Sequence, residues 1–162
     1  SSTGEEGKTV LGEDCFLMAY SHIGHNCRLG DGVIMANLAS LAGHVLIEDK
    51  AVIGGLVGIH QFTHVGTLSM IGGLSKVNQD VPPYALSDGV PCSVMDINAV
   101  GLRRLGFPSQ TRNILRRAFK ILFKSGLATS HAVEIVKSDL PRTPEIVHLL
   151  EFIAKSERGI GR

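Results

Sequence analysis

Residues 23–46 read IGHNCR, LGDGVI, MANLAS and LAGHVL, four consecutive hexads that each begin with an aliphatic side chain. The same period extends in both directions, from Leu11 to the hexad VNQDVP at residues 77–82. Every first position is Leu, Ile, Met or Val, and every fifth position is small or β-branched. A period of six is typical of a parallel β-helix in which three short strands close each coil, and hexads indicate its left-handed form.

The repeat also predicts how the coils are built and stacked. The hexads form four coils, so the prism is roughly 19 Å tall at about 4.8 Å per stacked strand. First-position side chains point inward, and the frequent second-position glycines are expected to relieve crowding at corners that need unusual dihedral angles. Because such a short prism exposes its end coils, we expect capping or association with other chains.

The hexad period ends at VPPY, residues 81–84, where two prolines cannot donate to a ladder of hydrogen bonds. A loop containing DGVP at residues 88–91 is expected to follow. Amphipathic segments then predict helices over residues 98–105, 109–124 and 130–138, and a fourth helix that begins at Thr143-Pro144. We therefore expect a left-handed parallel β-helix over residues 1–84 and a small all-α domain over residues 85–162.

The composition excludes several classes of protein. A net charge of +1 over 162 residues gives no general attraction to nucleic acid. No apolar run approaches the roughly 18 residues of a transmembrane helix. Three cysteines without a CxxC pair predict free thiols in a reducing compartment, and hence a cytoplasmic location.

A basic strip runs along the predicted helices. Its members are Arg103, Arg104, Arg112, Arg116, Arg117, Lys120 and Lys124. Such a strip is most often a solvated face, and the alternative is a docking surface for an acidic partner or a phosphate.

The lattice places several polar residues together, because residues 18 apart stack on adjacent coils. His25, Gly43 and Gln61 share one column, and Asn26 and His44 share the next. His60 lies beside the first column, and His22 lies one corner away. None of these histidines occupies an inward first position, so all are expected to point outward.

Three interpretations of the outward histidines are open. They can be solvated residues or subunit contacts. They can bind zinc, as three histidines do in left-handed β-helix hydratases, although no Cys or acidic ligand clusters with them and we expect no metal. They can also supply a general base, because an imidazole with a pKa near 6.5 suits proton abstraction at neutral pH. In that case the Gly43 N–H is placed to donate to an oxyanion.

Six segments together resemble one family. They are HIGHNC (22–27), LAGHV (41–45), HQF (60–62), IGG (71–73), QDVPPY (79–84) and NAVGLRRLGF (98–107). The chain resembles the acyl-carrier-protein:UDP-N-acetylglucosamine O-acyltransferases that begin lipid A synthesis. The resemblance covers only the C-terminal three-fifths or so of a typical member, so we expect the chain to lack coils that precede Ser1.

The resemblance implies a homotrimer with active sites in the clefts between neighbouring β-helices, and no cofactor. His25 would remove the proton from the glucosamine 3-hydroxyl of UDP-N-acetylglucosamine. That oxygen would attack the thioester of a 3-hydroxyacyl-acyl carrier protein, and the Gly43 amide would stabilise the oxyanion. The cleft-lining positions carried over are His22, Asn26, His44, His60 and Gln61.

Three further positions complete the implied site. Gly73 matches the position that measures acyl length, and a glycine there predicts a longer chain. Asn98 and Arg104 match positions near the uridine and phosphates. Some residues depart from the family pattern. Asn26 stands where many members have Asp, and Val100 and Leu105 replace a carboxylate and a second arginine of the nucleotide-binding helix.

The alternatives are the N-acyltransferase of the same pathway, a zinc-dependent hydratase of the same fold, and a non-catalytic scaffold. HQF, QDVPPY and the GLRR segment favour the O-acyltransferase.

Overall fold

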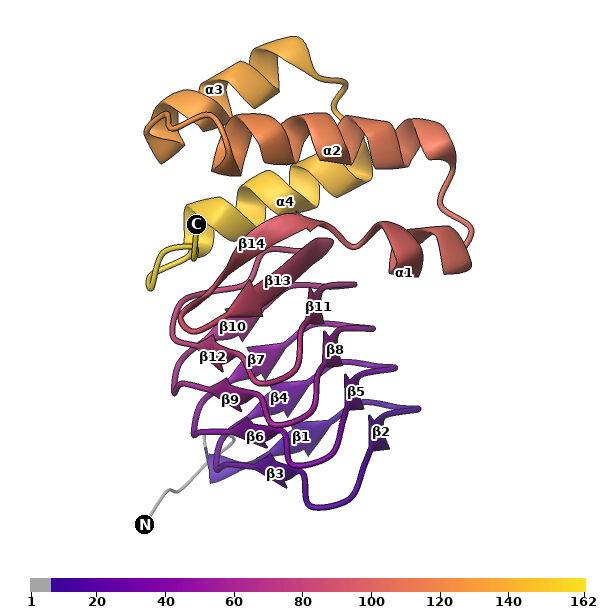
Figure 1. The fold of residues 1–162 in the computed structure, drawn as a ribbon, viewed down its shortest axis with the longest axis vertical. Coiled ribbons are helices and arrows are strands. Elements are labelled where there is room, and N and C mark those ends of the chain that lie inside the picture. The colour runs from indigo at the N-terminus through magenta and orange to yellow at the C-terminus, as the bar shows by residue number, and fades with distance from the viewer. Residues whose placement is uncertain (1–6) are drawn as a thin grey trace.

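The structure is a computed structural model that describes residues 7–162. Twelve two-residue strands wind through three parallel sheets, one strand per sheet in each coil (Figure 1). Each strand pairs with the strand one coil away, 18 residues distant, as in Val10 with Arg28 and Ile34 with Val52. The predicted left-handed parallel β-helix is confirmed.

The three sheets take every third strand. The first holds β1 (Val10–Leu11), β4 (Arg28–Leu29), β7 (Leu46–Ile47) and β10 (His64–Val65). The second holds β2 (Phe16–Leu17), β5 (Ile34–Met35), β8 (Val52–Ile53) and β11 (Met70–Ile71). The third holds β3 (His22–Ile23), β6 (Ser40–Leu41), β9 (Gly58–Ile59) and β12 (Lys76–Val77).

The turns between the sheets form three corners, which we name for their prominent residues. The acidic corner joins the first sheet to the second at residues 12–15, 30–33, 48–51 and 66–69. The leucine corner joins the second sheet to the third at residues 18–21, 36–39, 54–57 and 72–75. The histidine corner joins the third sheet to the next coil of the first at residues 24–27, 42–45, 60–63 and 78–81.

First-position side chains fill the interior, as predicted. Met35, Leu41 and Ile53 have no exposed surface, whereas Leu11 and Leu17 in the lowest described coil are 47% and 38% exposed. The lowest coil therefore leaves aliphatic side chains uncovered, which burial between coils would otherwise stabilise.

Second-position glycines have one of the two roles expected of them. A Cβ on Gly24 would lie 2.7 Å from the Ala42 carbonyl carbon, so glycine does relieve crowding between coils. The expectation that these glycines supply unusual dihedral angles is wrong. Left-handed backbone falls on the fourth position, where non-glycine residues such as Asn26, His44 and Phe62 have φ of 60–63°.

A β-hairpin closes the upper end of the prism, where the sequence analysis expected only a loop. β13 (Ala85–Gly89) pairs in parallel with β11, and β14 (Cys92–Ile97) pairs antiparallel with β13. The second sheet thus continues beyond residue 84, and the proposed division at 84/85 stays a prediction. The first six residues of the 1–84 unit lie outside the described residues.

Four helices follow, close to the predicted ranges. They are α1 (Ala99–Arg104), α2 (Ser109–Phe123), α3 (Thr129–Asp139) and α4 (Pro144–Lys155). The Thr143 hydroxyl caps α4 by accepting a hydrogen bond from the Ile146 N–H at 3.3 Å. α4 lies above the hairpin, and α2 and α3 lie beyond it (Figure 1). Within residues 7–162, no helix has the length and apolar run needed to cross a membrane.

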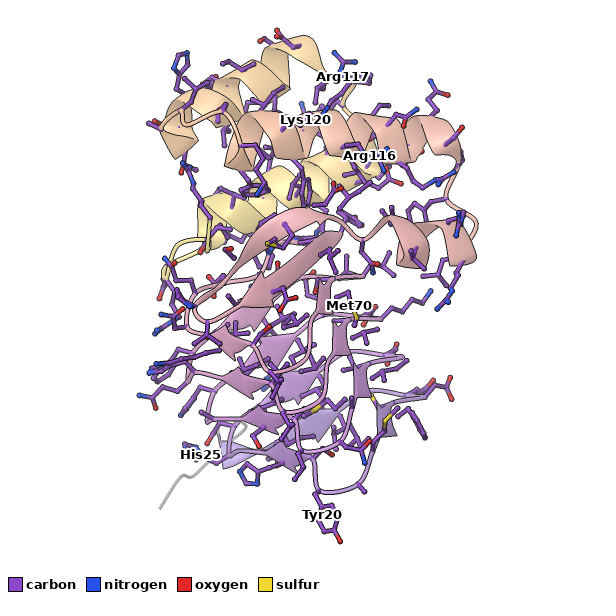
Figure 2. All side chains as sticks on the ribbon, viewed as in Figure 1. Tyr20, His25, Met70, Arg116, Arg117 and Lys120 are labelled. Atoms are coloured by element: carbon purple, nitrogen blue, oxygen red, sulfur yellow. The ribbon has the colours of Figure 1, made fainter. Side chains whose placement is uncertain are left out.

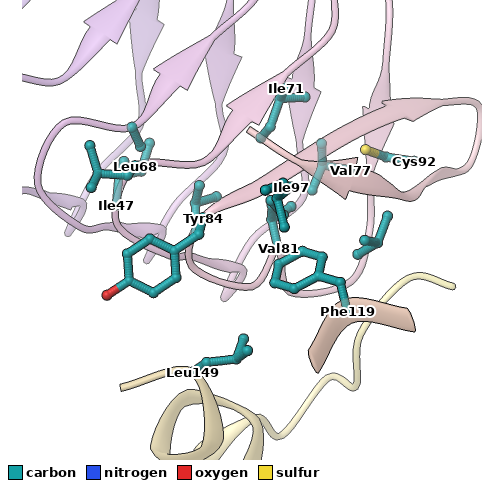
Figure 3. Packing of buried hydrophobic residues seen from close by; sticks show 14 of the residues in the cluster. Ile47, Leu68, Ile71, Val77, Val81, Tyr84, Cys92, Ile97, Phe119 and Leu149 are labelled. Atoms are coloured by element: carbon teal, nitrogen blue, oxygen red, sulfur yellow. The ribbon is translucent and has the colours of Figure 1, made fainter. Parts of the chain in front are cut away.

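The core is continuous between the prism and the helices. Figure 3 shows Val81 and Ile97 of the last coil and hairpin near Phe119 of α2 and Leu149 of α4. All four side chains are buried. The helices therefore cap the upper end of the β-helix and remove its apolar surface from water.

Glu48 links the first sheet to α4. Its Oε1 accepts a hydrogen bond from His64 Nε2 at 3.0 Å, and its Oε2 accepts from His148 Nε2 and from the Thr67 N–H, each at 2.7 Å. Burial alone would raise the pKa of Glu48, but these three hydrogen bonds outweigh it and lower the pKa to about 2.

This carboxylate predicts an acid-sensitive stability. A lowered pKa contributes stability at pH above the unfolded value of 4.5, and that contribution is lost as the pH falls toward 2. We expect Glu48→Gln to lower the free energy of unfolding at pH 7 by about 3 kcal/mol and to flatten its dependence on pH between 5 and 2. Denaturant unfolding across this range measures both effects. Glu134→Gln, at an exposed ion pair with Lys137, is the control and should change stability little; parallel pH curves for wild type and Glu48→Gln would contradict the assignment.

Candidate active site

The histidine corner brings His25, Gly43 and Gln61 into one vertical column, as the lattice predicted. The His44 N–H donates to the His25 carbonyl at 2.9 Å, and the Phe62 N–H donates to the Gly43 carbonyl at 3.2 Å. These bonds fix the spacing of the three coils, so the side chains at the corner project from a rigid backbone. His25 lies near the lower end of the prism in Figure 2.

The His25 imidazole lies directly against Gly43. A Cβ placed on Gly43 would be 2.6 Å from both Cε1 and Nε2 of His25, closer than real Cβ contacts allow. Gly43 has no positive φ, so what glycine provides here is the space that the His25 ring occupies, and any side chain would displace that ring. Gly43 is itself buried, whereas His25 is exposed.

Asn26 fixes one nitrogen of the His25 ring. Its Oδ1 lies 2.9 Å from His25 Nδ1. An amide oxygen can only accept, so Nδ1 carries the proton and Nε2 keeps the lone pair that a general base needs. The neutral amide therefore takes the orienting position in which many family members were expected to have Asp.

The Gly43 N–H differs from equivalent groups at the acidic corner. There, the Glu13 N–H donates to Asp31 Oδ1 and the Asp31 N–H donates to Asp49 Oδ1, each at 2.8 Å. In the part of the chain that the structure describes, the Gly43 N–H donates to no protein acceptor. A bound oxygen would therefore displace no protein acceptor from this N–H.

His44 and Phe62 extend the site upward in the neighbouring column. The His25 and His44 rings are perpendicular with centroids 5.1 Å apart, and the His44 and Phe62 rings are stacked at 4.7 Å. His44 was among the predicted site residues, and Phe62, which the lattice puts in the same column, was not. The 18-residue spacing from His44 was the signal that could have found it.

His22 and His60 lie on the face of the third sheet. Small residues between them leave a shallow hollow of about 400 Å³, which Lys76 closes on the far side. His60 Nδ1 lies 3.1 Å from the Gln61 carbonyl and donates to it, which leaves Nε2 available toward the hollow. Lys76 was not among the predicted site residues, although its place one coil above Gly58 puts it on this face.

Cys27 lies two residues after His25 but faces the core. It has no exposed surface, its Sγ donates to the Ala42 carbonyl at 3.0 Å, and burial raises the pKa of its thiol. A raised pKa disfavours the thiolate, so Cys27 is not suited to act as a nucleophile.

The remaining predicted residues lie elsewhere in the chain. Gly73 is at the leucine corner. Asn98 caps α1 and donates through Nδ2 to the Leu68 carbonyl at the acidic corner, and Arg104 ends the same helix. Because α1 lies beside the upper end of the prism and β3 at its lower end (Figure 1), one chain does not bring Asn98 and Arg104 to His25.

No metal cluster forms at the histidine corner within one chain. Among residues 7–162, no group of three or more His, Cys, Asp or Glu side chains is arranged to hold a metal ion. The zinc interpretation therefore lacks a ligand set in the described part of a single chain.

Comparison with known proteins identifies the family. Residues 80–161 match the model described as UDP N-acetylglucosamine O-acyltransferase, domain 2, and residues 8–43 match the bacterial transferase hexapeptide family with six repeats. The chain belongs to the UDP-N-acetylglucosamine O-acyltransferase family. The suspected resemblance is confirmed.

Relatives and solved structures of this family cover nearly all of the chain. The acyl-[acyl-carrier-protein]–UDP-N-acetylglucosamine O-acyltransferase of Thermodesulfovibrio yellowstonii is 54% identical over 162 residues, which is 100% of this chain and 63% of that protein. The enzyme of the same name from Burkholderia orbicola is 43% identical over 96% of this chain and 61% of its own length. The structure of the UDP-N-acetylglucosamine O-acyltransferase from Moraxella catarrhalis superimposes with a TM-score of 0.91 at 35% identity, over 95% of this chain and 60% of that one. The chain thus spans about three-fifths of the length of these family members.

Proposed function

We propose that this chain carries the catalytic part of an O-acyltransferase. The enzyme would move a 3-hydroxyacyl group from acyl carrier protein to the glucosamine 3-hydroxyl of UDP-N-acetylglucosamine, the first step of lipid A synthesis. The observation that carries the proposal is that the His25 imidazole lies against Gly43 in a chain of this family. The Nε2 of His25 and the backbone N–H of Gly43 are thereby next to each other, and neither has a hydrogen-bond partner within residues 7–162.

The geometry supports a direct transfer without a covalent enzyme intermediate. His25 Nε2 takes the proton of the 3-hydroxyl as its oxygen attacks the thioester carbonyl carbon. The Gly43 N–H donates to the oxyanion that forms on the carbonyl oxygen. When the tetrahedral intermediate collapses, the carbon–sulfur bond breaks and His25 returns the proton to the departing thiolate of the carrier.

Asn26 helps through orientation. Its Oδ1 accepts from the Nδ1–H of His25, which selects the tautomer whose lone pair is on Nε2 and restrains the ring. A neutral amide stabilises the imidazolium less than a carboxylate does, because it supplies a dipole and not a charge. His22, His44, His60 and Gln61 then line the surface on which the sugar and the acyl chain lie.

A homotrimer would complete the site. Asn98 and Arg104 are far from His25 within one chain, so a second copy has to supply them to the same cleft. The outer face of the second sheet supports association, because a column of apolar side chains runs along it. Its members are Phe16, Ile34, Val52, Met70 and Leu86, and Phe16 is 58% exposed. Figure 2 shows Met70 on this outer face.

The basic strip of α2 suits the docking of acyl carrier protein as an acidic partner. Arg117 and Lys120 are exposed on the outer side of α2, and Arg116 lies beside them (Figure 2). Clustered cations speed the encounter with an acidic protein and add specificity. The free thiols of Cys15, Cys27 and Cys92 agree with a cytoplasmic site of action, where thiols stay reduced.

Acyl transfer with a graded series of donors tests the proposal. The purified chain is incubated with 3-hydroxyacyl-acyl carrier proteins of increasing length and UDP-N-acetylglucosamine, and the acylated sugar nucleotide is measured. Transfer to the 3-hydroxyl supports the proposal. Transfer only to the 3-amino analogue of the sugar would show a different sugar preference of the same transferase. Transfer to the free amine of a glucosamine nucleotide, with none to the 3-hydroxyl, favours the N-acyltransferase, and stoichiometric zinc with no transfer favours a hydratase.

Gly73 predicts the outcome of a length-switching variant. A Cβ at this position would lie 3.2 Å from the Gly55 carbonyl oxygen, so a larger side chain is crowded by the coil below and has to extend away from it. We expect Gly73→Leu to shift the preferred donor to a shorter acyl chain while activity with short donors is retained. Relative kcat/KM across the donor series measures the shift, and an unchanged length preference would show that Gly73 does not bound the acyl chain.

A further inference from the structure

Phe62 is an exposed aromatic residue one coil above His44, and no step of the proposed reaction uses it. Its ring is 57% exposed, and its backbone has a left-handed φ of 63°. Its one stacked aromatic partner within residues 7–162 is His44, with centroids 4.7 Å apart and planes 20° apart. Exposed apolar residues with left-handed backbone also occupy the fourth position at the leucine corner, but Phe62 differs from them because its ring stacks on a histidine of the proposed site.

We propose that Phe62 is a positioning residue that orients the His25 imidazole through His44, an inference that rests on the proposed role of His25 as the base. The His44 ring cannot turn about its side-chain axis without losing its stacked contact with Phe62. The His25 ring in turn meets His44 perpendicularly at 5.1 Å, a preferred geometry for a pair of aromatic rings. Phe62 thus restrains the orientation of the His44 ring, and His44 in turn restrains that of the His25 ring one coil below.

The His25 ring needs this second support. Its one hydrogen bond in the described part of the chain runs from Nδ1 to the neutral Asn26 Oδ1, and the residue is exposed. A single hydrogen bond to a neighbouring side chain leaves the ring free to tilt. A small misplacement of the reacting nitrogen lowers the rate, because the attacking hydroxyl and the thioester must be aligned within a narrow range.

The test replaces the flat ring while keeping an apolar side chain. In Phe62→Leu, we expect kcat for acyl transfer to fall about 3- to 10-fold, as for the loss of one aromatic contact, with KM for UDP-N-acetylglucosamine within twofold of wild type. Phe62→Tyr keeps the stacked ring and should restore kcat. Tyr20→Leu is the matched control, because Tyr20 occupies the same fourth position with a φ of 61° at the leucine corner, and its kcat should not change.

A spectroscopic readout separates this proposal from the function of the site. The imidazole proton resonances of His44 and His25 should shift in Phe62→Leu and stay in place in Tyr20→Leu. Unchanged resonances, an unchanged kcat in an active enzyme, a change confined to KM, or a failure of Phe62→Tyr to restore kcat would each overturn the proposal. If the wild-type chain transfers no acyl group, the proposed function fails, and the resonances still decide whether Phe62 orients the two rings.

Discussion

In a His25→Ala variant, kcat for acyl transfer to UDP-N-acetylglucosamine should fall by roughly 10²–10⁴-fold, the usual contribution of a general base. The sugar hydroxyl would then have to lose its proton to water as it attacks the thioester. Because His25 is exposed, the free energy of unfolding should change little. Single-turnover kinetics with saturating donor measure the chemical step directly.

The natural control is His131→Ala. His131 is an exposed histidine on α3, away from the histidine corner, so it matches the chemistry of the substitution without touching the site. His131→Ala should keep wild-type kcat. If His25→Ala retains more than a few per cent of activity, His25 is not the base.

Gly43→Ala carries the second large effect. The added methyl group would lie 2.6 Å from Cε1 and Nε2 of the imidazole, so the ring has to leave its position. We expect kcat to fall by about 10²-fold, because the base is displaced and the approach to the Gly43 N–H is narrowed at the same time. Gly43 has no positive φ, so alanine suits the backbone and the thermal midpoint should stay close to that of wild type.

Two comparisons separate these causes. Gly55→Ala makes the same substitution at a third position of the leucine corner, where the nearest atom to the new methyl group is the Asn37 carbonyl oxygen at 3.4 Å, and it should be nearly neutral. In a His25→Ala background, Gly43→Ala should cost little if its whole effect is to displace the imidazole. Any further loss in that background measures the contribution of the oxyanion donor. A Gly43→Ala enzyme with wild-type kcat would contradict the proposed geometry.

The prism could be predicted because one aliphatic residue at the start of each hexad marks the repeat. Each first-position aliphatic side chain can be buried only in the interior, so the period determines the strands and their register. The register in turn places Gly43 directly above His25. The hairpin of β13 and β14 escaped prediction for the opposite reason. Its inward residues include Ala85, Ser87 and Cys92, which are too small or polar to mark a buried face.

Contacts between distant segments were also beyond the sequence. Glu48 and His148 are 100 residues apart, and their hydrogen bond depends on where α4 settles on the first sheet. The helix boundaries could be read from capping residues and amphipathic spacing, but the direction in which a helix crosses the prism depends on side-chain packing at the junction. The same limit applies to Asn98, whose position at the acidic corner follows from its hydrogen bond to the Leu68 carbonyl.

The spacing of 18 residues gives the histidine corner an approximate translational symmetry along the axis of the prism. In such a lattice a reactive side chain can lie where the residue one coil above it has no side chain, and here that residue is Gly43. A chain with histidine at position 43 and glycine at position 61 would carry this histidine–glycine pair one coil higher. The pair would then be displaced by roughly 4.8 Å relative to Gly73 on the neighbouring corner. If Gly73 bounds the acyl chain as proposed, the accepted length would then change by the height of one coil, with the same backbone.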